Sequence, residues 1–598
     1  MISLHLQVFA YRTISRSALA VALVALLVPA PDLAAQGRGR CENGRVARIT
    51  IETQPVFGDS AGVVLSKVYA AANWLHIETR ERVIRRELLF RPGDCYDPLR
   101  ISESERLLRE FTFLQSASVE ATQRRGGDWD VAVVTRDDWS LRLEPQFQFG
   151  GGLAVTGIGV AERNLWGTGR GIELVYVDQP GRDEVGAAYF DPRFLGTRWD
   201  LWLSGARTEP GWLLRGTVAY PFLGLVGRRA AFEDALYGER WFRYIVGDGE
   251  SRSELILPYM QRALQVGGAL RLLAAPRGEA TKSGTYGLTL SYERLSYGTS
   301  FFQDGLEPNG SDLSDAEADS LLSLTLRERE SVRLNLVVGV RGLEFVQRSG
   351  VSTLRGKEDI ALGVTADFLL GLAARGFGSA DSHLLAALDL YGGSRVRGDW
   401  FTLVRANVEA RRDYVARRWR DIFAAFQWNN YWRLSRQHSV LLTAQGVGGW
   451  RATVPFQLTL GAPWGLAGFA AHRYPGGARV VLRLEDRYLL GSVGKLFDLG
   501  TALFVDGGRM WTNDEALPGV NSGFRGSVGA SLRLATPAGA RLTYRLDIAA
   551  PIDVRTALDD IVVSLRIERV LRLERDPIDS QLTRSRDFAL SSAAANLK

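Results

Sequence analysis

The chain has 598 residues, too many for one compact soluble core, so two or more domains are expected. Nearly half of the residues are apolar and glycine and aromatic residues are common, but there are only three methionines and two cysteines, which favours β-structure in an oxidising compartment. The net charge of +6 is small for this length, and the sequence has no basic stripe with interleaved aromatic residues, which argues against a nucleic-acid partner.

The start of the chain, residues 1–35, has the pattern of a cleaved secretory signal peptide. Arg12 and Arg16 precede an apolar run from Ala18 to Val28, and the small pair Ala34-Ala35 follows. A helix that spans a membrane needs about 20 apolar residues, which neither this run nor any later one supplies. We therefore expect an exported protein without a transmembrane helix.

Residues 41–137 predict a small α+β domain. Two segments carry apolar residues at helical spacing, three show the pattern of short strands, and Ser102 is expected to cap the second helix. The expected order is strand, helix, helix, strand, strand. The elements are strands at 46–51, 117–122 and 129–135, helices at 80–89 and 102–113, and an insert at 54–79.

Both cysteines of the chain, Cys41 and Cys95, fall in this first domain. In an exported protein a disulfide between them is expected, because it would pin the N-terminal strand to the turn between the two helices. The alternative is two independent thiols.

From Trp139 onward the pattern changes to about twenty candidate strands separated by turn residues, and no helix is expected. Gly523–Ala535, Arg541–Ile548 and Asp560–Ile567 keep a strict two-residue alternation, with apolar side chains on one face and Arg, Asp, Ser or Thr on the other. A soluble sandwich would bury the apolar face between sheets, whereas a membrane barrel would turn it toward lipid.

Three features favour the barrel, which we assign to residues 139–573. The chain is exported, the polar face pairs arginines with acidic residues, and aromatic residues such as Trp202, Phe426, Tyr431 and Trp432 gather at strand ends, as in an interfacial girdle. The fold class is therefore mainly β, a transmembrane antiparallel β-barrel behind one small α+β domain. The polar tail, residues 574–598, is expected to be disordered.

Three patterns that could carry chemistry have simpler explanations. The acidic insert Gly298–Glu330 does not match the spacing of a calcium-binding EF-hand loop and is expected to be a solvated external loop. The histidines are too scattered for a metal cluster, and His438 and its neighbour Ser439 would point to opposite faces of a strand. The glycine-rich run at Gly167–Gly171 has no helix after it and is expected to be a turn. We therefore expect no enzyme activity, no metal and no cofactor.

Several motifs, in their order along the chain, resemble those of the BamA/TamA outer-membrane assembly superfamily, with a single periplasmic POTRA domain. The resemblance implies an outer-membrane barrel of about sixteen strands, contacts with membrane lipid, unfolded outer-membrane or secreted proteins as clients, and periplasmic chaperones or lipoproteins as further partners. The motifs are Glu87–Asp97 and Ser104–Arg109 in the POTRA-like part, and Glu162–Gly169, Phe190–Phe194, Glu485–Tyr488 and Phe504–Gly508 in the barrel.

The resemblance also implies a lumen loop. In the family the sixth external loop folds into the barrel and carries an Arg-Gly-aromatic motif; the matching stretch is Leu466-Ala467-Gly468-Phe469, with Ala467 in place of the arginine. The family's arginine contacts the wall near the aspartate that matches Asp506. A buried carboxylate without a partner is costly, so we hypothesise that Arg473 replaces the arginine. The expected wall partners are Glu485, Arg487, Phe504, Asp506 and Gly508.

The first barrel strand, Leu141–Phe149, contains Pro145 and runs into Gly150 and Gly151. Proline removes a backbone donor and glycine weakens strand order, so both suit an edge at a weak seam between the first and last strands. An opened edge could pair with a client strand by β-augmentation. The alternative is that Pro145 only marks a barrel rim.

The expected function is outer-membrane protein assembly or translocation by strand templating at this seam. Two other classes stay open at this point. A dedicated secretion transporter would also use a POTRA domain, but it would normally carry a second one and a plug helix. A passive channel would share the barrel and its arginine-rich lumen but would not need the first domain.

Overall fold

A computed structural model describes most of the chain from residue 41 to residue 568. The predicted signal peptide, most of the insert at 54–79, Gly150, Gly151 and the polar tail lie outside the described residues. The described ranges are 41–57, 76–149, 153–179, 182–247, 253–273, 281–303, 314–462, 465–470, 473–513, 517, 519–552 and 560–568.

The N-terminal domain is a three-stranded sheet with two helices, in the order that the sequence predicts. In the sheet, β3 is central, parallel to β1 and antiparallel to β2. Apolar residues of both helices and all three strands form one buried core under the sheet. The elements are β1 (Val46–Gln54), α3 (Glu81–Glu87), α4 (Pro98–Glu110), β2 (Leu114–Gln123) and β3 (Trp129–Asp137).

Helix α4 begins four residues earlier than predicted, and its cap is Asp97 instead of Ser102. The Asp97 carboxylate accepts hydrogen bonds from the backbone N–H groups of Leu99 (2.9 Å) and Arg100 (3.4 Å), and Pro98 occupies the first helical position. An Asp-Pro pair is a strong helix start, because the carboxylate satisfies free N–H groups and proline lacks one. The sequence Asp97-Pro98 therefore carries a local signal for the helix start that Ser102 does not.

Cys41 and Cys95 form a disulfide with their Cα atoms 5.3 Å apart. Arg45 forms an isolated β-bridge with Cys95, so the bond ties the start of β1 to the turn before α4. The covalent link therefore joins the two ends of the segment that contains the insert.

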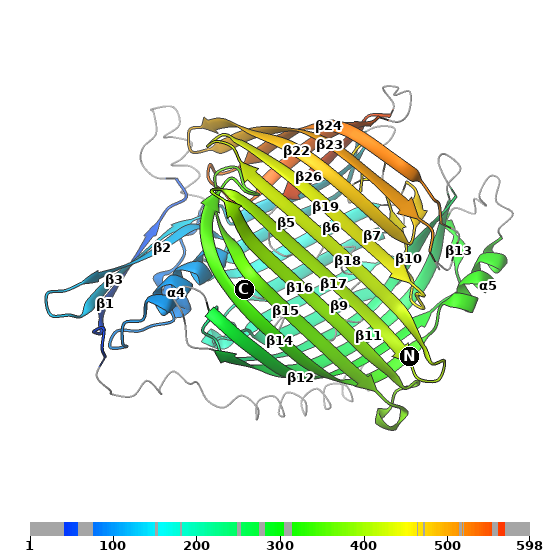
Figure 1. Cartoon of the computed structure of the whole chain (residues 1–598), viewed down its shortest axis with the longest axis horizontal. Coiled ribbons are helices and arrows are strands. Elements are labelled where there is room, and N and C mark those ends of the chain that lie inside the picture. Colours follow the sequence, from blue (N-terminus) through cyan, green and yellow to red (C-terminus); the bar gives the residue numbers. More distant parts are fainter. Residues whose placement is uncertain are drawn as a thin grey trace.

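The described strands between Leu141 and Glu568 form a closed antiparallel barrel (Figure 1). The closed order holds twenty-one strands, of which β13 has only two residues, so the described residues form twenty strands of seven residues or more. The barrel therefore has more strands than the approximately sixteen that the resemblance implies, and it agrees with the approximately twenty candidate strands of the sequence.

The strands are β4 (Leu141–Phe149), β5 (Leu153–Leu165), β6 (Arg170–Gln179), β7 (Arg182–Asp191), β8 (Asp200–Thr208), β9 (Trp212–Tyr220), β10 (Arg229–Val246), β11 (Ser253–Leu273), β12 (Thr281–Tyr297), β13 (Phe301–Phe302), β14 (Arg329–Ser349), β15 (Lys357–Ala373), β16 (His383–Arg397), β17 (Trp400–Asp413), β18 (Arg418–Arg433), β19 (His438–Trp450), β22 (Ala478–Val493), β23 (Phe497–Trp511), β24 (Gly523–Ala535), β25 (Thr543–Pro551) and β26 (Val562–Glu568). Two short 3-10 turns, η2 (Phe194–Gly196) and η4 (Arg375–Phe377), interrupt the connections.

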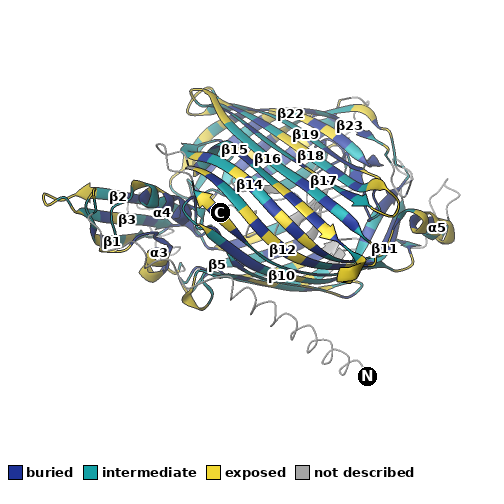
Figure 2. Cartoon of the chain, turned by 60° about the horizontal axis from the view of Figure 1, so that its bottom comes forward, coloured by how far each residue is buried: buried dark blue, intermediate teal, exposed yellow. Residues whose placement is uncertain are grey.

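The barrel wall turns its apolar side chains outward and its polar side chains inward, as the bands of alternating exposure in Figure 2 show. On β23, Leu503 is 66% exposed and Val505 43%, whereas Phe504 and Asp506 between them are buried. A soluble sandwich would bury the apolar face, so this pattern confirms the barrel.

The aromatic girdle is only partly as predicted. Phe426 and Trp432 lie exposed on the outer face of β18, but Tyr431 is buried on the inner face. Successive residues of a strand point to opposite sides, so Tyr431 cannot share a membrane-facing surface with Trp432.

The acidic insert Gly298–Glu330 contains a helix, α5 (Asp315–Thr325), where only a loop was expected. Ser314 and Glu317 form a reciprocal capping box, and Ala318 and Leu322 are buried against the barrel's apolar cluster. None of the described helices has the length and apolar character that a bilayer crossing requires. Within the described ranges, no three His, Cys, Asp or Glu side chains are grouped so as to hold a metal ion.

The N-terminal domain lies at one end of the barrel, here called the near end, and α5 lies at the other, the far end (Figure 1). Asn164, next to the last residue of β5, donates its amide to the hydroxyl of Thr79 (2.8 Å). The β5–β6 turn therefore lies at the near end. Because successive strands run in opposite directions, the following turns lie there too: β7–β8, β9–β10, β11–β12, β14–β15, β16–β17, β18–β19, β22–β23 and β24–β25.

Candidate functional site

Residues 451–477, which link β19 to β22, fold back into the barrel and are here called the lumen loop. Its two arms pair through β20 (Leu458–Thr459) and β21 (Pro475–Gly476). Leu466 donates its N–H to the carbonyl of Leu460 (2.7 Å), so the tip turns back on the first arm. The side chain of Leu466 is completely buried, as expected for a loop that enters the lumen.

The tip of the lumen loop binds the wall through its backbone. Ala467 donates its N–H to the Asp506 carboxylate (3.1 Å), and Gly468 donates to the hydroxyl of Ser527 on β24 (3.1 Å). A Cβ atom on Gly468 would lie 2.6 Å from the backbone carbon of Ala550, so no larger residue fits there. The predicted motif is thus in contact with three neighbouring strands, β23, β24 and β25.

Gly508, one of the predicted wall partners, allows the loop to come close. A Cβ atom at this position would lie 2.5 Å from the carbonyl oxygen of Val480 and 3.3–3.4 Å from the side chains of Leu460 and Leu466. The absence of a side chain at Gly508 therefore lets Leu460 and Leu466 of the loop pack directly against the backbone of β23.

The cationic partner of Asp506 is Arg483, which corrects the hypothesis that named Arg473. The Arg483 guanidinium lies 2.6 Å from the Asp506 carboxylate, and Ser527 donates its hydroxyl to the same carboxylate. The strand register places Arg483, Asp506 and Ser527 directly opposite one another on β22, β23 and β24. Side chains directly opposite each other on neighbouring strands are close enough to interact, so the register itself brings Arg483 to Asp506.

Arg473 lies instead next to its neighbour in sequence, with its guanidinium 5.7 Å from the ring centre of Tyr474. Among the described residues it makes no ion pair with Asp506. Sequence reasoning could have found Arg483, because it shares the inward parity of Glu485 and Arg487 on the same strand.

Phe504 connects the loop tip to the charged wall. Its ring lies 4.6 Å from the guanidinium of Arg483 and 5.5 Å from that of Arg545, and it packs against Ala467 and Ala549. Both cation–π contacts are buried in the barrel interior, where such contacts are strongest.

Glu485 and Arg487, the remaining predicted wall partners, belong to a second buried ion network. Glu485 accepts from Arg487 (2.6 Å) and from Arg545 on β25 (2.8 Å), and Arg545 also binds Asp547 (2.6 Å). Glu485 is completely buried. The network therefore links β22 to β25 across the two strands that lie between them, β23 and β24.

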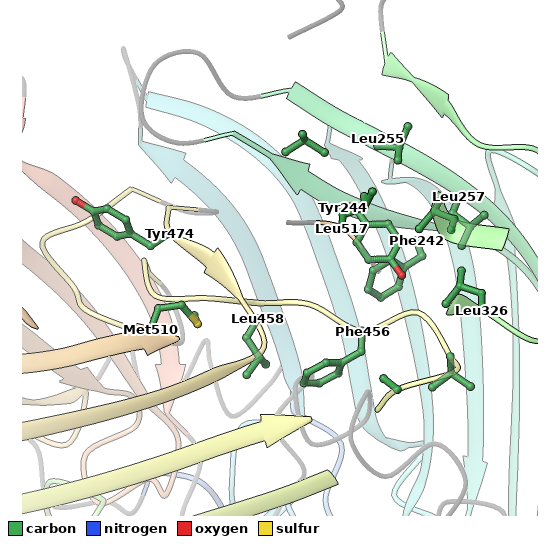
Figure 3. Close-up of a cluster of buried hydrophobic side chains, with 14 of the residues drawn as sticks. Phe242, Tyr244, Leu255, Leu257, Leu326, Phe456, Leu458, Tyr474, Met510 and Leu517 are labelled. Carbon is green, nitrogen blue, oxygen red and sulfur yellow. The ribbon is translucent and has the colours of Figure 1, made fainter. Parts of the chain in front are cut away.

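The first arm of the lumen loop crosses the far end of the barrel to the opposite wall. Figure 3 shows Phe456 and Leu458 of the loop in one buried cluster with Phe242 and Tyr244 of β10. Between them, the Gln457 amide accepts from the N–H of Ile245 (2.7 Å) and donates to its carbonyl (3.0 Å). The loop is thus anchored on both sides, and protein occupies this end of the lumen.

The seam of the barrel lies between β4 and β26. These are short strands, nine and seven residues, compared with 21 in β11 and β14. The carbonyl of Ser140 accepts from Arg163 (3.0 Å) of β5, so even-numbered residues of β4 direct their backbone groups to β5. In an antiparallel ladder the odd-numbered residues then face the other neighbour. The missing N–H of Pro145 therefore lies on the β26 side, at the seam.

A further near-end element was missed by sequence reasoning: residues 350–356, here called the near-end turn, fold inward between β14 and β15. Glu358 accepts from the N–H groups of Val351 (3.2 Å), Ser352 (3.1 Å) and Thr353 (2.9 Å). Arg487 of β22 donates to the carbonyl of Val351 (3.0 Å). Arg533 of β24 donates to that of Ser352 (2.8 Å), so the turn bridges distant strands.

The N-terminal domain is docked on the near end by charged contacts. Arg109 of α4 makes a bidentate ion pair with Asp359 of β15 (2.8 and 2.9 Å), and Glu103 accepts from the N–H of Leu225 (2.6 Å). Arg541 of the β24–β25 turn donates to the carbonyl of Phe111 (2.6 Å). The domain thus contacts turns from several parts of the barrel.

Glu87 of α3 forms another of these docking contacts, through the guanidinium of Arg193. Burial raises the pKa of the Glu87 carboxyl above its usual value, and the positive charges of Arg193 and Arg198 lower it in part. A completely enclosed carboxylate therefore depends on these two arginines of the β7–β8 turn.

Taken together, a closed barrel with an apolar outside, a charged inside and an inserted loop defines a membrane β-barrel. Residues 426–564, in the last third of the chain, match the Omp85 superfamily domain. The matched segment contains the lumen loop, Arg483, Asp506 and the last strands.

Three solved structures are similar at low identity. BamA from Haemophilus ducreyi lacking POTRA domains 1–3 is 14% identical, with a TM-score of 0.36 over 89% of this chain and 84% of that chain. CdiB from Acinetobacter baumannii is 11% identical, with a TM-score of 0.37 over 88% and 73%. CdiB from Escherichia coli is 12% identical, with a TM-score of 0.34 over 92% and 98%. No curated protein matches the chain.

Proposed function

We propose that this protein assembles or translocates other proteins at the outer membrane by pairing client strands with an opened β4–β26 seam. The observation that carries the proposal is the seam itself: short strands, with the one proline of β4 directed at β26. A proline there removes one ladder hydrogen bond, so this junction costs less to open than the long pairings elsewhere. A client strand could then add to the free edge of β4.

In the same proposal residues 41–137 are a POTRA-type domain in the periplasm, exported by a signal peptide at 1–35, and residues 139–573 are the barrel in membrane lipid. The sheet order leaves β1 and β2 as edge strands, which suits capture of unfolded outer-membrane or secreted clients by β-augmentation. The near end then faces the periplasm, where chaperones or lipoproteins could deliver these clients.

A disulfide lock across the seam tests the mechanism. Leu143 of β4 lies on the outer face, as do Val563 and Leu565 of β26, so the double variants Leu143→Cys/Val563→Cys and Leu143→Cys/Leu565→Cys bracket the unknown register. We expect the oxidised, locked protein in liposomes to fold an unfolded barrel client at least about tenfold more slowly, with recovery after reduction. Client folding is read from heat-modifiable mobility on a gel.

The matched control locks β4 to its other neighbour. Leu143 lies opposite Val160 of β5, a pair that stays together whether or not the seam opens. The Leu143→Cys/Val160→Cys variant should keep full activity when oxidised. Equal activity of the seam-locked and control-locked proteins would reject seam opening as the mechanism.

Dedicated secretion of one substrate is the second candidate, because the lumen and an N-terminal domain would also serve it. A passive channel is less favoured, because the lumen loop crosses the far end of the barrel and anchors on β10. Depletion of the protein followed by proteomics of the outer membrane separates the classes. Loss of many barrel proteins indicates assembly, loss of one exported protein indicates secretion, and a change in solute uptake alone indicates a channel.

A further inference from the structure

We propose that a cleft at the near end of the barrel binds a phosphate group, supplied by the headgroup of an anionic phospholipid or by free phosphate. The cleft is open to solvent and lies between the near-end turn, the β18–β19 turn and the strands β22 and β24. Its lining includes four arginines and one histidine, and no Asp or Glu. The basic residues are Arg433, Arg436, Arg487, Arg533 and His438.

Two of these arginines carry charge that the described residues do not neutralise. Arg433 donates to the backbone carbonyls of Ser349 (2.9 Å), Ser435 (3.1 Å) and Arg436 (3.4 Å), and within the described part of the chain it makes no ion pair with a carboxylate. Arg436 is exposed, and within that same part of the chain its guanidinium makes no ion pair. The cleft therefore holds two positive charges that no described carboxylate balances, and the exposed guanidinium of Arg436 is the one that a ligand would meet first.

The other charged groups around the cleft are accounted for by the protein. Arg487 is paired with Glu485, and Arg533 donates to Ser352 of the near-end turn. The carboxylate of Asp486, which lies beside Arg487 on β22, is 2.5 Å from the imidazole of His438. These contacts fix the walls, so that a ligand would meet a formed cleft with a net positive potential.

The position of the cleft suits a lipid headgroup. Tyr488, which lines it, is half exposed on the outer face of β22, and Trp432, next to Arg433, is half exposed on the outer face of β18. Tyrosine and tryptophan mark the level of the lipid headgroups in membrane proteins. Basic pockets at this level bind anionic headgroups, and guanidinium groups match the geometry of phosphate oxygens. This placement takes the near end to be at a membrane surface, but it does not depend on client assembly.

The test compares lipid binding to Arg436→Gln and wild type in nanodiscs made from equal parts of phosphatidylglycerol and phosphatidylcholine. Lipid that stays bound is identified by native mass spectrometry. One surface arginine contributes about 1 kcal/mol to attraction of an anionic surface, so Arg436→Gln should lower retention of phosphatidylglycerol over phosphatidylcholine about fivefold. Arg436 is exposed and makes no side-chain contact that folding would require, and Arg436→Glu should lower retention further.

The matched control is Arg397→Gln, which removes an exposed arginine at the near end of β16 and outside the cleft. This variant should retain phosphatidylglycerol as wild type does.

A second arm adds inorganic phosphate to detergent-solubilised protein. Phosphate binding that is lost in Arg436→Gln identifies a free anion as ligand, and selective retention of phosphatidylglycerol without phosphate binding identifies the lipid. The proposal would be overturned if the wild type neither preferred phosphatidylglycerol to phosphatidylcholine nor bound phosphate. It would also be overturned if Arg436→Gln and Arg397→Gln retained phosphatidylglycerol equally well. Both outcomes are independent of the seam experiment.

Discussion

Asp506 and Arg483 form a buried ion pair between β23 and β22. The Asp506 carboxylate is 2% exposed and also receives hydrogen bonds from Ala467 and Ser527. Buried ion pairs contribute little net stability against apolar replacements, but the loss of one partner leaves an uncompensated charge. The pair therefore controls whether the tip of the lumen loop stays on the wall.

We expect Arg483→Gln to destabilise the folded barrel by about 3–5 kcal/mol, because Asp506 would remain buried without a cation. The measurement is the urea midpoint for loss of the heat-resistant folded band on a gel. Arg509→Gln, which removes an exposed arginine from the outer face of β23, is the control and should change little.

The double variant Arg483→Gln/Asp506→Asn provides the decisive comparison at this pair. It removes both charges, so most of the lost stability should return. If the double variant is as unstable as Arg483→Gln alone, the two side chains do not form the energetic pair that their 2.6 Å contact implies.

Among the elements, β1 of the N-terminal domain depends on a covalent tie. Its first residue, Val46, pairs with the start of β3, and Cys41 lies only five residues before it, bonded to Cys95. A disulfide between distant positions restricts the unfolded chain, with a typical effect of 2–4 kcal/mol. The insert near 54–79 makes the connection between β1 and α3 long, which adds to the cost of closing it without the bond.

We expect Cys41→Ser/Cys95→Ser to raise the equilibrium constant for local opening of β1 by at least about thirtyfold. This factor corresponds to about 2 kcal/mol, the lower end of the typical stabilisation by a disulfide. Backbone amide hydrogen exchange of Val46–Gln54 measures it, and the barrel strands should exchange as in wild type. Treatment of the wild type with a reductant should reproduce the result. Unchanged exchange in β1 would show that the sheet alone holds this strand.

The whole molecule is held together by contacts between segments far apart in sequence. Arg109 and Asp359 are separated by 250 residues, and their bidentate pair joins α4 to β15 next to Glu358 of the near-end turn. The same turn receives Arg487 and Arg533 from the last third of the barrel. The near-end turn therefore connects the docked N-terminal domain to β22 and β24. No local sequence pattern indicates these contacts.

We expect Arg109→Ala to loosen the domain on the barrel, because Asp359 would lose its bidentate partner. The readout is the distance distribution between one spin label on the exposed tip of the N-terminal sheet and one on the far end of the barrel. The distribution should broaden, and amide exchange in the β14–β15 turn should rise about fivefold, as for the loss of roughly 1 kcal/mol. Arg124→Ala, which breaks an exposed ion pair with Asp130 within the N-terminal domain, is the control and should change neither measurement.

Much of the architecture followed from local patterns. The two-residue alternation on β24 predicted its bounds, because side-chain direction in a strand depends only on position along it. Glu485 and Arg487 were expected at the wall from the family resemblance, and their common parity on β22 agrees with that expectation. The same reasoning would have predicted Arg483. Helix α5 and the cap at Asp97 also had local signals, Ser314 with Glu317 and the Asp-Pro pair, that were overlooked.

By itself, then, the sequence determined the order of the elements, the face on which each strand side chain lies, and the pairing of the only two cysteines. Only the tertiary structure decided the number of strands in the closed barrel, the partner of Asp506, the path of the lumen loop to β10 and the meeting of Arg109 with Asp359. The physical reason is that side-chain alternation is a property of one strand, whereas register, closure and docking depend on which distant segments pair. That choice depends on the free energy of the complete chain.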